Sequence, residues 1–362
     1  MHVLICGGGV IGASIAYFLA RRGARSTVIE RAGVACAASG KSGGFLALDW
    51  CAATPLDALA RRSFALHAQL ADEIAGEWGY RRMTTYAGFA AGRSRRSASG
   101  FHLDWVADEV TLSQRLGGTQ TTAQVHPGRF TQALIEAAKP HAELRIGEVT
   151  GVAREGGRVV GVHVDGDTVA GDAVVIAMGP WSMLAAAWLP LPAVYGLKGH
   201  SLVFDTGTQV PPEALFLDYR EDTGAVHAPE IFPRVDGTTY VCAISSESPV
   251  PLDPATVVPD PGAIERLEAM CARLSPVLAH SPILARQACF RPVTRDGLPL
   301  IGRVPGLANA YVATGHSVWG ILNAPATGEA MAELIVDGAA RTVDLAPFDP
   351  ARLKPLARMR SA

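Results

Sequence analysis

The fold is decided at the start of the chain, by Met1-His2-Val3-Leu4-Ile5-Cys6-Gly7-Gly8-Gly9-Val10-Ile11-Gly12. An apolar strand runs into a Gly-x-Gly-x-x-Gly turn, and an Ala-rich helix follows over 13–20. In such a turn Gly7 permits the tight bend, Gly9 lets the backbone approach a pyrophosphate, and Gly12 lets helix and strand pack closely. The free N–H groups that begin the helix would face the phosphates. The stretch therefore predicts a dinucleotide-binding unit.

The next strand supports this interpretation. The strand predicted over 26–29 ends in Glu30. An acid about 20 residues past the glycines is where a carboxylate accepts hydrogen bonds from an adenosine ribose. A carboxylate there disfavours a ribose phosphate, so the motif favours FAD or NAD over NADP. The alternative, a chance glycine-rich turn, leaves the flanking helix and strand unexplained.

A second loop of small residues follows over 35–46. Its glycines permit close approach of the backbone to a ligand, and Ser39, Lys41 and Ser42 offer donors for a phosphate. Because the loop comes directly after the strand that ends in Glu30, we favour a ligand-binding loop over a flexible surface loop.

Composition excludes several classes of function. The chain has 362 residues, 49% of them hydrophobic, which is enough for a large core and indicates two domains. Its 32 basic and 34 acidic residues give a net charge of −2, too weak a field to attract nucleic acid. The basic cluster over 93–96 has no interleaved aromatic residues, so we expect a solvated loop there.

The cysteines and the apolar stretches add two more expectations. The 6 cysteines are scattered without a Cys-x-x-Cys pair, which indicates neither a metal site nor a disulfide framework and fits a reducing cytoplasm. The most apolar long stretch, 174–197, is broken by glycines and prolines. We therefore expect no membrane span.

The order of patterns predicts an α/β protein. We expect an amphipathic helix over 56–78, a helix over 129–138, and a buried parallel strand over 172–178. Alternating segments with glycines at their turns predict a β-meander made of 143–149, 158–164 and 167–170.

A change of texture marks a second domain. The section 193–284 is rich in proline and in strand-like runs. A pattern of alternating strands and helices begins again with a strand predicted over 310–313 and a helix over 323–335. We therefore predict a discontinuous Rossmann-like domain with an inserted, mostly antiparallel β domain. The first comprises 1–80, 122–192 and 285–345, the second 81–121 and 193–284, and 346–362 is a C-terminal extension.

Four further segments resemble the glycine oxidases and the wider D-amino-acid oxidase superfamily of FAD enzymes. They are Cys289–Gly302, Ala313–Gly328, Phe232–Gly237 and Ala177–Ser182, in family order along the chain. The resemblance implies FAD in place of NAD. By position in the motifs, the residues that would line FAD, besides the glycine turn, are Val10, Ile11, Glu30, Arg31, Ser39, Gly43, Gly44, Phe45, Val149 at the adenine end, Gly179, and His316, Gly320, Ile321 and Leu322 around the isoalloxazine.

The resemblance also implies a reaction, in which hydride leaves a carbon that bears an amine and the imine then hydrolyses. Arg291 falls where glycine oxidases place an arginine that pairs with the substrate carboxylate, and a guanidinium suits bidentate pairing. The alternative is a structural arginine. Gly320 to Leu322 begin a helix whose free N–H groups would stabilise charge on the reduced flavin.

Two positions depart from the glycine oxidases. Val318 stands where that family has a second arginine, and Glu230 stands where it has a tyrosine that closes the site. These departures argue against glycine as the substrate. Glu230 is a candidate to pair with a cationic substrate group or to act as a base toward the amine. The alternative is a solvated loop residue.

Three other residues are candidates near the flavin. Lys198 would assist oxygen or substrate charge, with a solvated strand-end lysine as the alternative, and Trp319 would form the pocket wall. In the related monomeric sarcosine oxidases a cysteine near the position of Cys289 bonds to the flavin. A buried apolar thiol is the favoured alternative, so we expect FAD to be held without a covalent bond.

Three functions stay open on the sequence. The first is an oxidase of a small-molecule amine or amino acid, with oxygen as acceptor. The second passes electrons to a quinone or an electron-transfer protein, and the third is a non-catalytic flavoprotein that serves as an assembly factor. A NAD-linked dehydrogenase is disfavoured because the segment 316–328 would have no role in it.

Overall fold

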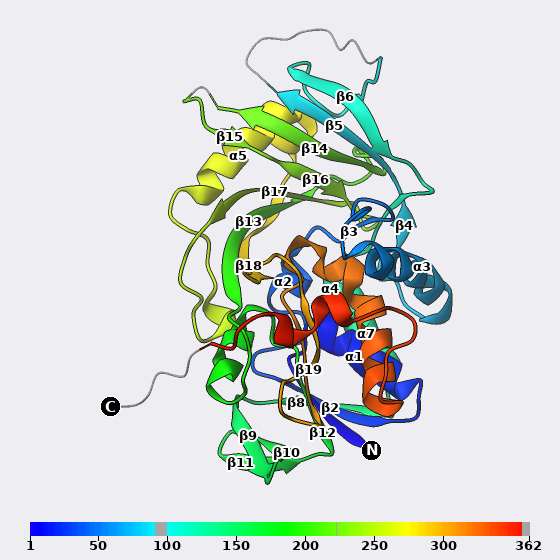
Figure 1. Cartoon of the computed structure of the whole chain (residues 1–362). Coiled ribbons are helices and arrows are strands. Elements are labelled where there is room, and N and C mark those ends of the chain that lie inside the picture. Colours follow the sequence, from blue (N-terminus) through cyan, green and yellow to red (C-terminus); the bar gives the residue numbers. More distant parts are fainter. Residues whose placement is uncertain (91–99, 222, 357–362) are drawn as a thin grey trace.

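Figure 1 shows the computed structural model, which describes residues 1–90, 100–221 and 223–356. The basic cluster over 93–96 and the last residues of the extension expected at 346–362 lie outside the described residues. Within them, every helix is too short or too polar to cross a membrane. The same residues bring no group of three or more His, Cys, Asp or Glu side chains together in a metal-binding arrangement.

One half of the molecule is built on a parallel sheet. Its six strands run in the order β19-β20-β12-β1-β2-β8, and only β19 and β20 pair antiparallel. The central strands are buried along almost their whole length, as expected for a sheet covered on both faces. The strands are β1 (His2–Cys6), β2 (Arg25–Glu30), β8 (Ala142–Ile146), β12 (Ala173–Ile176), β19 (Leu300–Arg303) and β20 (Ala310–Thr314).

The segment 143–149 was expected in the β-meander, and most of it lies elsewhere. It forms β8, which pairs in parallel with β2 and covers the edge that β2 would otherwise expose. The meander itself consists of β9 (Val149–Glu155), β10 (Arg158–Val164) and β11 (Asp167–Ala170).

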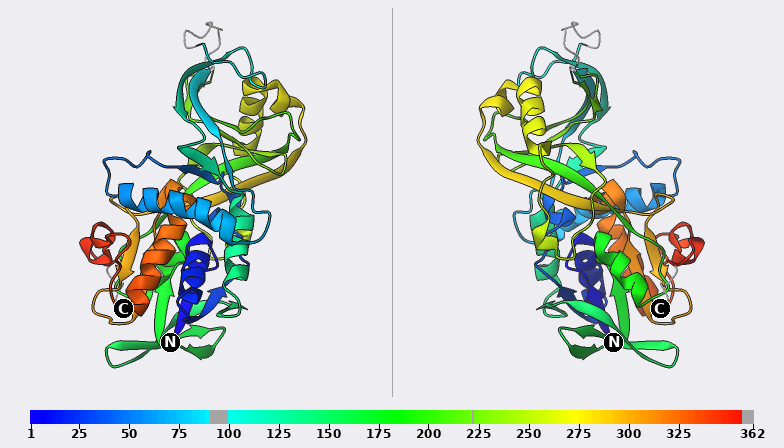
Figure 2. Two further views of the ribbon diagram at one scale, coloured as in Figure 1. Left: turned by 90° about the vertical axis from the view of Figure 1, so that its right-hand side faces the viewer. Right: turned by 90° about the vertical axis from the view of Figure 1, so that its left-hand side faces the viewer.

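Helices cover the parallel sheet in two layers. α1 (Val10–Ala20) and α7 (Gly320–Val336) pack against each other, α3 (Asp57–Glu73) packs on α7, and α4 (Pro127–Ala137) packs on α1. Figure 2 shows α1, α7 and α3 on the same side of the molecule. Their apolar faces and the sheet form one continuous core. The first and last parts of the chain therefore share a core.

The other half is built on an eight-stranded sheet, above the parallel sheet in Figure 1. Its path is β18-β13-β17-β16-β14-β5-β6, with β15 on β14, and only β14 and β5 pair in parallel. α5 (Ala263–Leu274) and α6 (Pro276–His280) belong to this half, and α5 packs on β13 and β17. The strands are β5 (Thr84–Ala90), β6 (Val110–Gly117), β13 (Tyr195–Asp205), β14 (Glu213–Arg220), β15 (Val226–His227), β16 (Glu230–Pro233), β17 (Thr238–Ser246) and β18 (Ile283–Val293).

Short elements join the two halves. A three-stranded sheet consists of β3 (Phe45–Ala47), β7 (Thr122–Gln124) and β4 (Arg81–Arg82), and the small-residue loop contains α2 (Ala38–Lys41). The boundary expected at residue 285 falls inside β18. The remaining short helices are η1 (Gly179–Ala187), η2 (Pro254–Thr256), η3 (Ser317–Trp319), η4 (Ala346–Phe348) and η5 (Pro350–Arg352).

Candidate functional site

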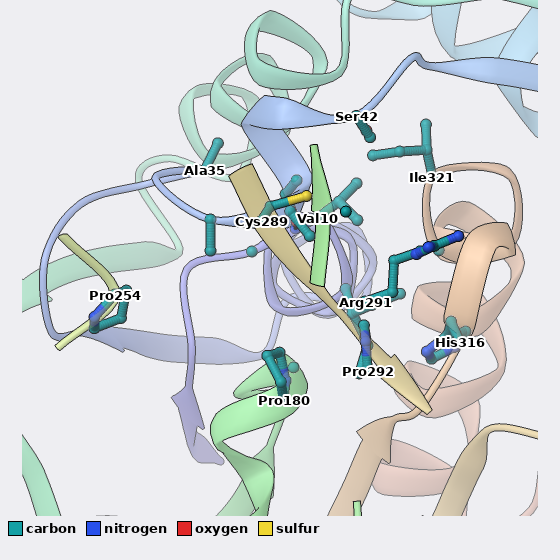
Figure 3. A pocket seen from close by; sticks show the side chains of 18 of the residues that line it. Val10, Ala35, Ser42, Pro180, Pro254, Cys289, Arg291, Pro292, His316 and Ile321 are labelled. Atoms are coloured by element: carbon teal, nitrogen blue, oxygen red, sulfur yellow. Dashed lines mark hydrogen bonds between the residues drawn. The ribbon is translucent and has the colours of Figure 1, made fainter. Parts of the chain in front are cut away.

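A cavity of about 550 Å³ lies between the two sheets. On one side it is lined by residues at the carboxyl ends of β1, β12 and β20, which is where open parallel sheets bind ligands. On the other side it is lined by residues of β13, β16, β17 and β18. In Figure 3 Val10, Cys289, Arg291, His316 and Ile321, which come from distant parts of the chain, lie around this cavity.

The structure brings most of the residues predicted to line FAD together in this cavity. They are Gly7, Gly9, Val10, Ile11, Glu30, Arg31, Ser39, Gly43, Gly44, Phe45, Val149, Gly179, His316, Gly320 and Ile321. Gly12 and Leu322 do not line the cavity and lie behind the residues that do. A Cβ on Gly12 would lie 2.0 Å from the carbonyl oxygen of Gly7, and Leu322 is buried in the core.

The beginning of α1 fits a pyrophosphate. The N-cap residue that precedes α1, Gly9, provides no side-chain cap, and the first turn of the helix contains no acidic residue. The Ser39 hydroxyl oxygen accepts a hydrogen bond from the Val10 N–H at 2.9 Å, which ties the small-residue loop to this helix. Glu30 accepts from the Gly8 N–H at 2.7 Å and so lies beside the glycine turn. An anion would satisfy the remaining N–H groups and the positive end of the helix dipole.

The beginning of α7 fits the flavin end in a similar way. The N-cap residue that precedes α7, Trp319, provides no side-chain cap, and the first turn of the helix has no acidic residue. Beside it, His316 is buried, and burial lowers its pKa to about 3, so the ring is neutral. Its Nε2 lies 3.1 Å from the Thr327 hydroxyl oxygen, while its Nδ1 is buried and has no hydrogen-bond partner among the residues that the structure describes. A polar ring edge in the cavity would satisfy that nitrogen.

α3 holds the beginning of α7 in place. Pro325 lies inside α7 and has no N–H, so the Ile321 carbonyl lacks its helical partner. His67 of α3 supplies one, because its Nε2 lies 3.0 Å from the Ile321 oxygen and 3.2 Å from that of Leu322. In addition, the Ser63 hydroxyl oxygen accepts from the Ala326 N–H at 3.0 Å. The sequence analysis missed this anchor, although a proline inside the predicted helix was a signal for it.

The buried His67 makes stability depend on pH. Burial lowers its pKa from 6.5 to about 4, so the unfolded chain binds a proton that the folded chain resists. Its stabilising contribution is complete above pH 6.5 and is lost as the pH falls toward 4. Between pH 7.5 and pH 5 the loss is about 2 kcal/mol. We expect His67→Gln, which keeps a donor but does not titrate, to reduce the pH dependence of the free energy of unfolding by this amount. Urea unfolding of both proteins at the two pH values would measure it, and equal pH dependence in both would contradict the expectation.

Arg291 of β18 and Glu230 of β16 both line the cavity. Arg291 donates a hydrogen bond to the Ser245 hydroxyl. The Cys242 thiol donates to Glu230 at 3.6 Å. Burial raises the pKa of Glu230 and outweighs the lowering by Cys242 and by the charge of Arg291. Glu230 is therefore a cavity residue that holds its proton more tightly than an ordinary glutamate.

Lys198 does not line the cavity, contrary to the sequence-based expectation. Lys198 lies in β13, where its cross-strand partners are Phe290 of β18 and Ser246 of β17. The next residue, Gly199, lines the cavity together with its own partner on β18, Cys289. Because side chains alternate along a strand, Lys198 points to the other face. Its Nζ lies 2.6 Å from an Asp260 carboxylate oxygen and helps to lower the pKa of Asp260 to about 2. The geometry is that of a structural ion pair.

Cys289 lines the cavity but is unsuited to attack on a ring. Its side chain is buried, and burial raises the pKa of the thiol. The thiolate is the nucleophilic form, so burial disfavours covalent attachment. Trp319 also lines the cavity, as predicted, and the sequence analysis missed Trp50, Phe216, Phe232 and Tyr240 beside it.

Comparison with known proteins identifies the family. The DAO model, described as FAD dependent oxidoreductase, matches residues 2–334. A Schizosaccharomyces pombe protein that is named as an oxidoreductase without a stated substrate is 30% identical, with 96% of this chain and 97% of that protein covered. The glycine oxidase of Pseudomonas putida is 27% identical, with 96% and 98% covered. The crystal structure of glycine oxidase from Geobacillus kaustophilus aligns with a TM-score of 0.81 at 27% identity, covering 97% of this chain and 98% of that one. These matches confirm the predicted fold class and cofactor, and the chain belongs to the DAO family of FAD-dependent oxidoreductases.

Proposed function

We propose that the enzyme oxidises the C–N bond of an amino acid or a related amine. When bound, FAD supplies the hydride acceptor. One observation carries the proposal: a cation and a carboxyl group, Arg291 and Glu230, line the same cavity near enough for the charge of Arg291 to lower the pKa of Glu230. A zwitterionic amino acid carries the two complementary charges. The similarity to glycine oxidases supports the same class of substrate.

In this proposal Arg291 binds the substrate carboxylate. Its guanidinium can donate two parallel hydrogen bonds to a carboxylate, and the Ser245 hydroxyl oxygen holds it in position by accepting a further one. β18 contacts η3, and Arg291, Trp319 and Gly320 line the same cavity, so Arg291 would orient the substrate close to the beginning of α7. With FAD bound, the N–H groups there would stabilise negative charge on the flavin ring.

Glu230 takes the amine side. Hydride leaves readily only from a carbon whose amine is neutral, so a group must accept the ammonium proton. A carboxylate in a buried site with a raised pKa is a stronger base than an exposed one. The proton would move from the substrate nitrogen to a Glu230 carboxylate oxygen before the C–H bond is broken.

The test is a panel of amines and amino acids mixed with the holoenzyme without oxygen, with the visible absorbance of the flavin as the readout. Loss of that absorbance identifies a substrate. Stopped-flow reoxidation by oxygen, compared with a quinone, then distinguishes an oxidase from a dehydrogenase. If no amine reduces the flavin, the proposal is wrong and the function of a non-catalytic flavoprotein gains support.

Replacing Glu230 tests its role as base. We expect Glu230→Gln to lower kcat/KM by about 100-fold and to remove the acid limb of its pH profile. Cys242→Ala is the matched control, because it leaves the carboxyl group and removes a hydrogen bond that lowers its pKa. The acid limb of that variant should move to higher pH. Unchanged turnover and affinity in Glu230→Gln would exclude the role.

A further inference from the structure

We infer that the substrate carries a large uncharged apolar group, and that an aromatic surface in the cavity binds it. This inference rests on the proposed function and names its substrate class. The aromatic surface consists of Phe45, Trp50, Phe216, Phe232 and Trp319, all of which line the cavity. The residues come from β3, the loop after it, β14, β16 and η3.

The rings of this aromatic surface form one continuous patch. The ring centroids of Trp50 and Phe216 lie 4.8 Å apart, and Phe45 lies 5.0 Å from each of them. Phe232 stacks on Phe45 at 5.3 Å, and Trp319 lies 6.5 Å from Trp50. These stacked, tilted and edge-to-face contacts fix the rings, so the patch is preformed.

The aromatic surface lies beside the residues proposed to hold the substrate. Phe216 is the direct cross-strand partner of Glu230 in the pairing of β14 with β16. Side chains of paired residues stand on the same face of a sheet, about 5 Å apart. At the other end, Trp319 immediately precedes the first residues of α7. A group attached to the amine-bearing carbon would therefore meet these rings.

Part of the aromatic surface remains exposed inside the cavity. Trp50, Phe216 and Trp319, which are not among the residues predicted to line FAD, are only half-buried, although they lie inside a cavity. An apolar ligand group would remove this area from water, which favours binding by about fourfold for each buried methyl or methylene group. Glycine brings no such group, so these rings would contribute nothing to its selection.

The charges of the lining argue for an uncharged side chain. Glu148 pairs with Arg31 at 3.1 Å, and Glu30 accepts from the backbone of the glycine turn, so both belong to the nucleotide end. Among the other lining residues the acid is Glu230 and the arginine is Arg291. The amine and carboxylate of the substrate use both. A third charge would lose water of hydration beside these rings and would find no counter-ion among the lining residues, which is costly.

The experiment compares glycine, alanine, leucine, phenylalanine and lysine, as both enantiomers where they exist, by the rate of flavin reduction. We expect kcat/KM to rise about fourfold per added carbon, hence roughly 60-fold from alanine to leucine. Equal kcat/KM values across the series, or the highest kcat/KM for glycine or lysine, would overturn the inference and leave the proposed function standing.

A second measurement does not depend on turnover. Acetate and phenylacetate are titrated into the oxidised holoenzyme, and the shift of the flavin spectrum reports binding. We expect phenylacetate to bind at least tenfold more tightly. Equal affinities would contradict the aromatic surface. Tight phenylacetate binding with no amine oxidised would instead reject the proposed reaction and keep the apolar subsite.

Variants locate the effect on the aromatic surface. Trp50→Ala should reduce the preference for leucine over alanine at least tenfold while FAD content is unchanged, and Trp50→Phe should restore most of it. Phe89→Ala is the matched control, since Phe89 is an aromatic residue of β5 that is 41% exposed and absent from the cavity lining. Equal losses for leucine and alanine in Trp50→Ala would show a general structural role and contradict the inference.

Discussion

Replacing Arg291 with alanine is expected to lower kcat/KM for an amino-acid substrate by about 100- to 1000-fold. Truncating one partner of a desolvated charge pair costs about 2–5 kcal/mol, and the middle of that interval corresponds to this range. Most of the loss should fall on KM, because the carboxylate is bound equally in the ground state and the transition state. Steady-state kinetics on the best substrate of the panel would measure it.

Two controls separate substrate binding from a structural role of Arg291. Arg291→Lys keeps the charge but cannot form the bidentate pair, so its kcat/KM should be intermediate. An amine that lacks the carboxylate should be oxidised by Arg291→Ala about as well as by the native enzyme. If both substrates lose the same factor, Arg291 maintains the cavity and does not bind the carboxylate.

The nucleotide half could be predicted in detail because its signals are local in sequence. The strand, turn and helix that contain Gly7, Gly9 and Gly12 are consecutive, and Glu30 ends the next strand. Such a motif specifies its own local geometry, so the residues expected to face a ligand follow from spacing alone. The segment at 316–322 could be placed only through family resemblance, since nothing in its spacing relates it to residues about 300 positions earlier.

The substrate half was harder because its geometry depends on pairing between distant strands. The positions of Trp50, Phe216 and Phe232 in the sequence do not reveal that their rings meet. Lys198 shows the same difficulty in a single residue. A shift of one position along β13 moves a side chain to the opposite face of the sheet, and the sequence does not show which face Lys198 occupies. The segment that became β8 was misplaced because its alternation suits a meander as well as an edge strand.

The close contact between α1 and the glycine turn predicts that a substitution at Gly12 strongly reduces stability and FAD binding. A Cβ at residue 12 would lie 2.0 Å from the Gly7 carbonyl oxygen and 3.2 Å from the Ile5 side chain. The Gly7 backbone has φ of +117° and packs closely against that of Ala177, since even a Cβ at residue 7 would lie 2.3 Å from the Ala177 oxygen, so the turn has little room to shift away from α1. We therefore expect Gly12→Ala to displace α1, to destabilise the fold by about 3 kcal/mol, and to yield protein with little bound FAD.

Gly33→Ala provides the matched control for this prediction. Gly33 lines the same cavity, and a Cβ there would have no atom within 4 Å. The flavin-to-protein absorbance ratio after purification and the FAD dissociation constant on reconstitution would compare the two variants. Gly33→Ala should bind FAD like the native chain, whereas Gly12→Ala should bind it at least tenfold more weakly, because the free N–H groups of α1 move with the helix. If Gly12→Ala retains native FAD affinity, the close approach of α1 to the turn does not position the pyrophosphate, and the N–H groups of the small-residue loop that contains Ser39 must do so instead.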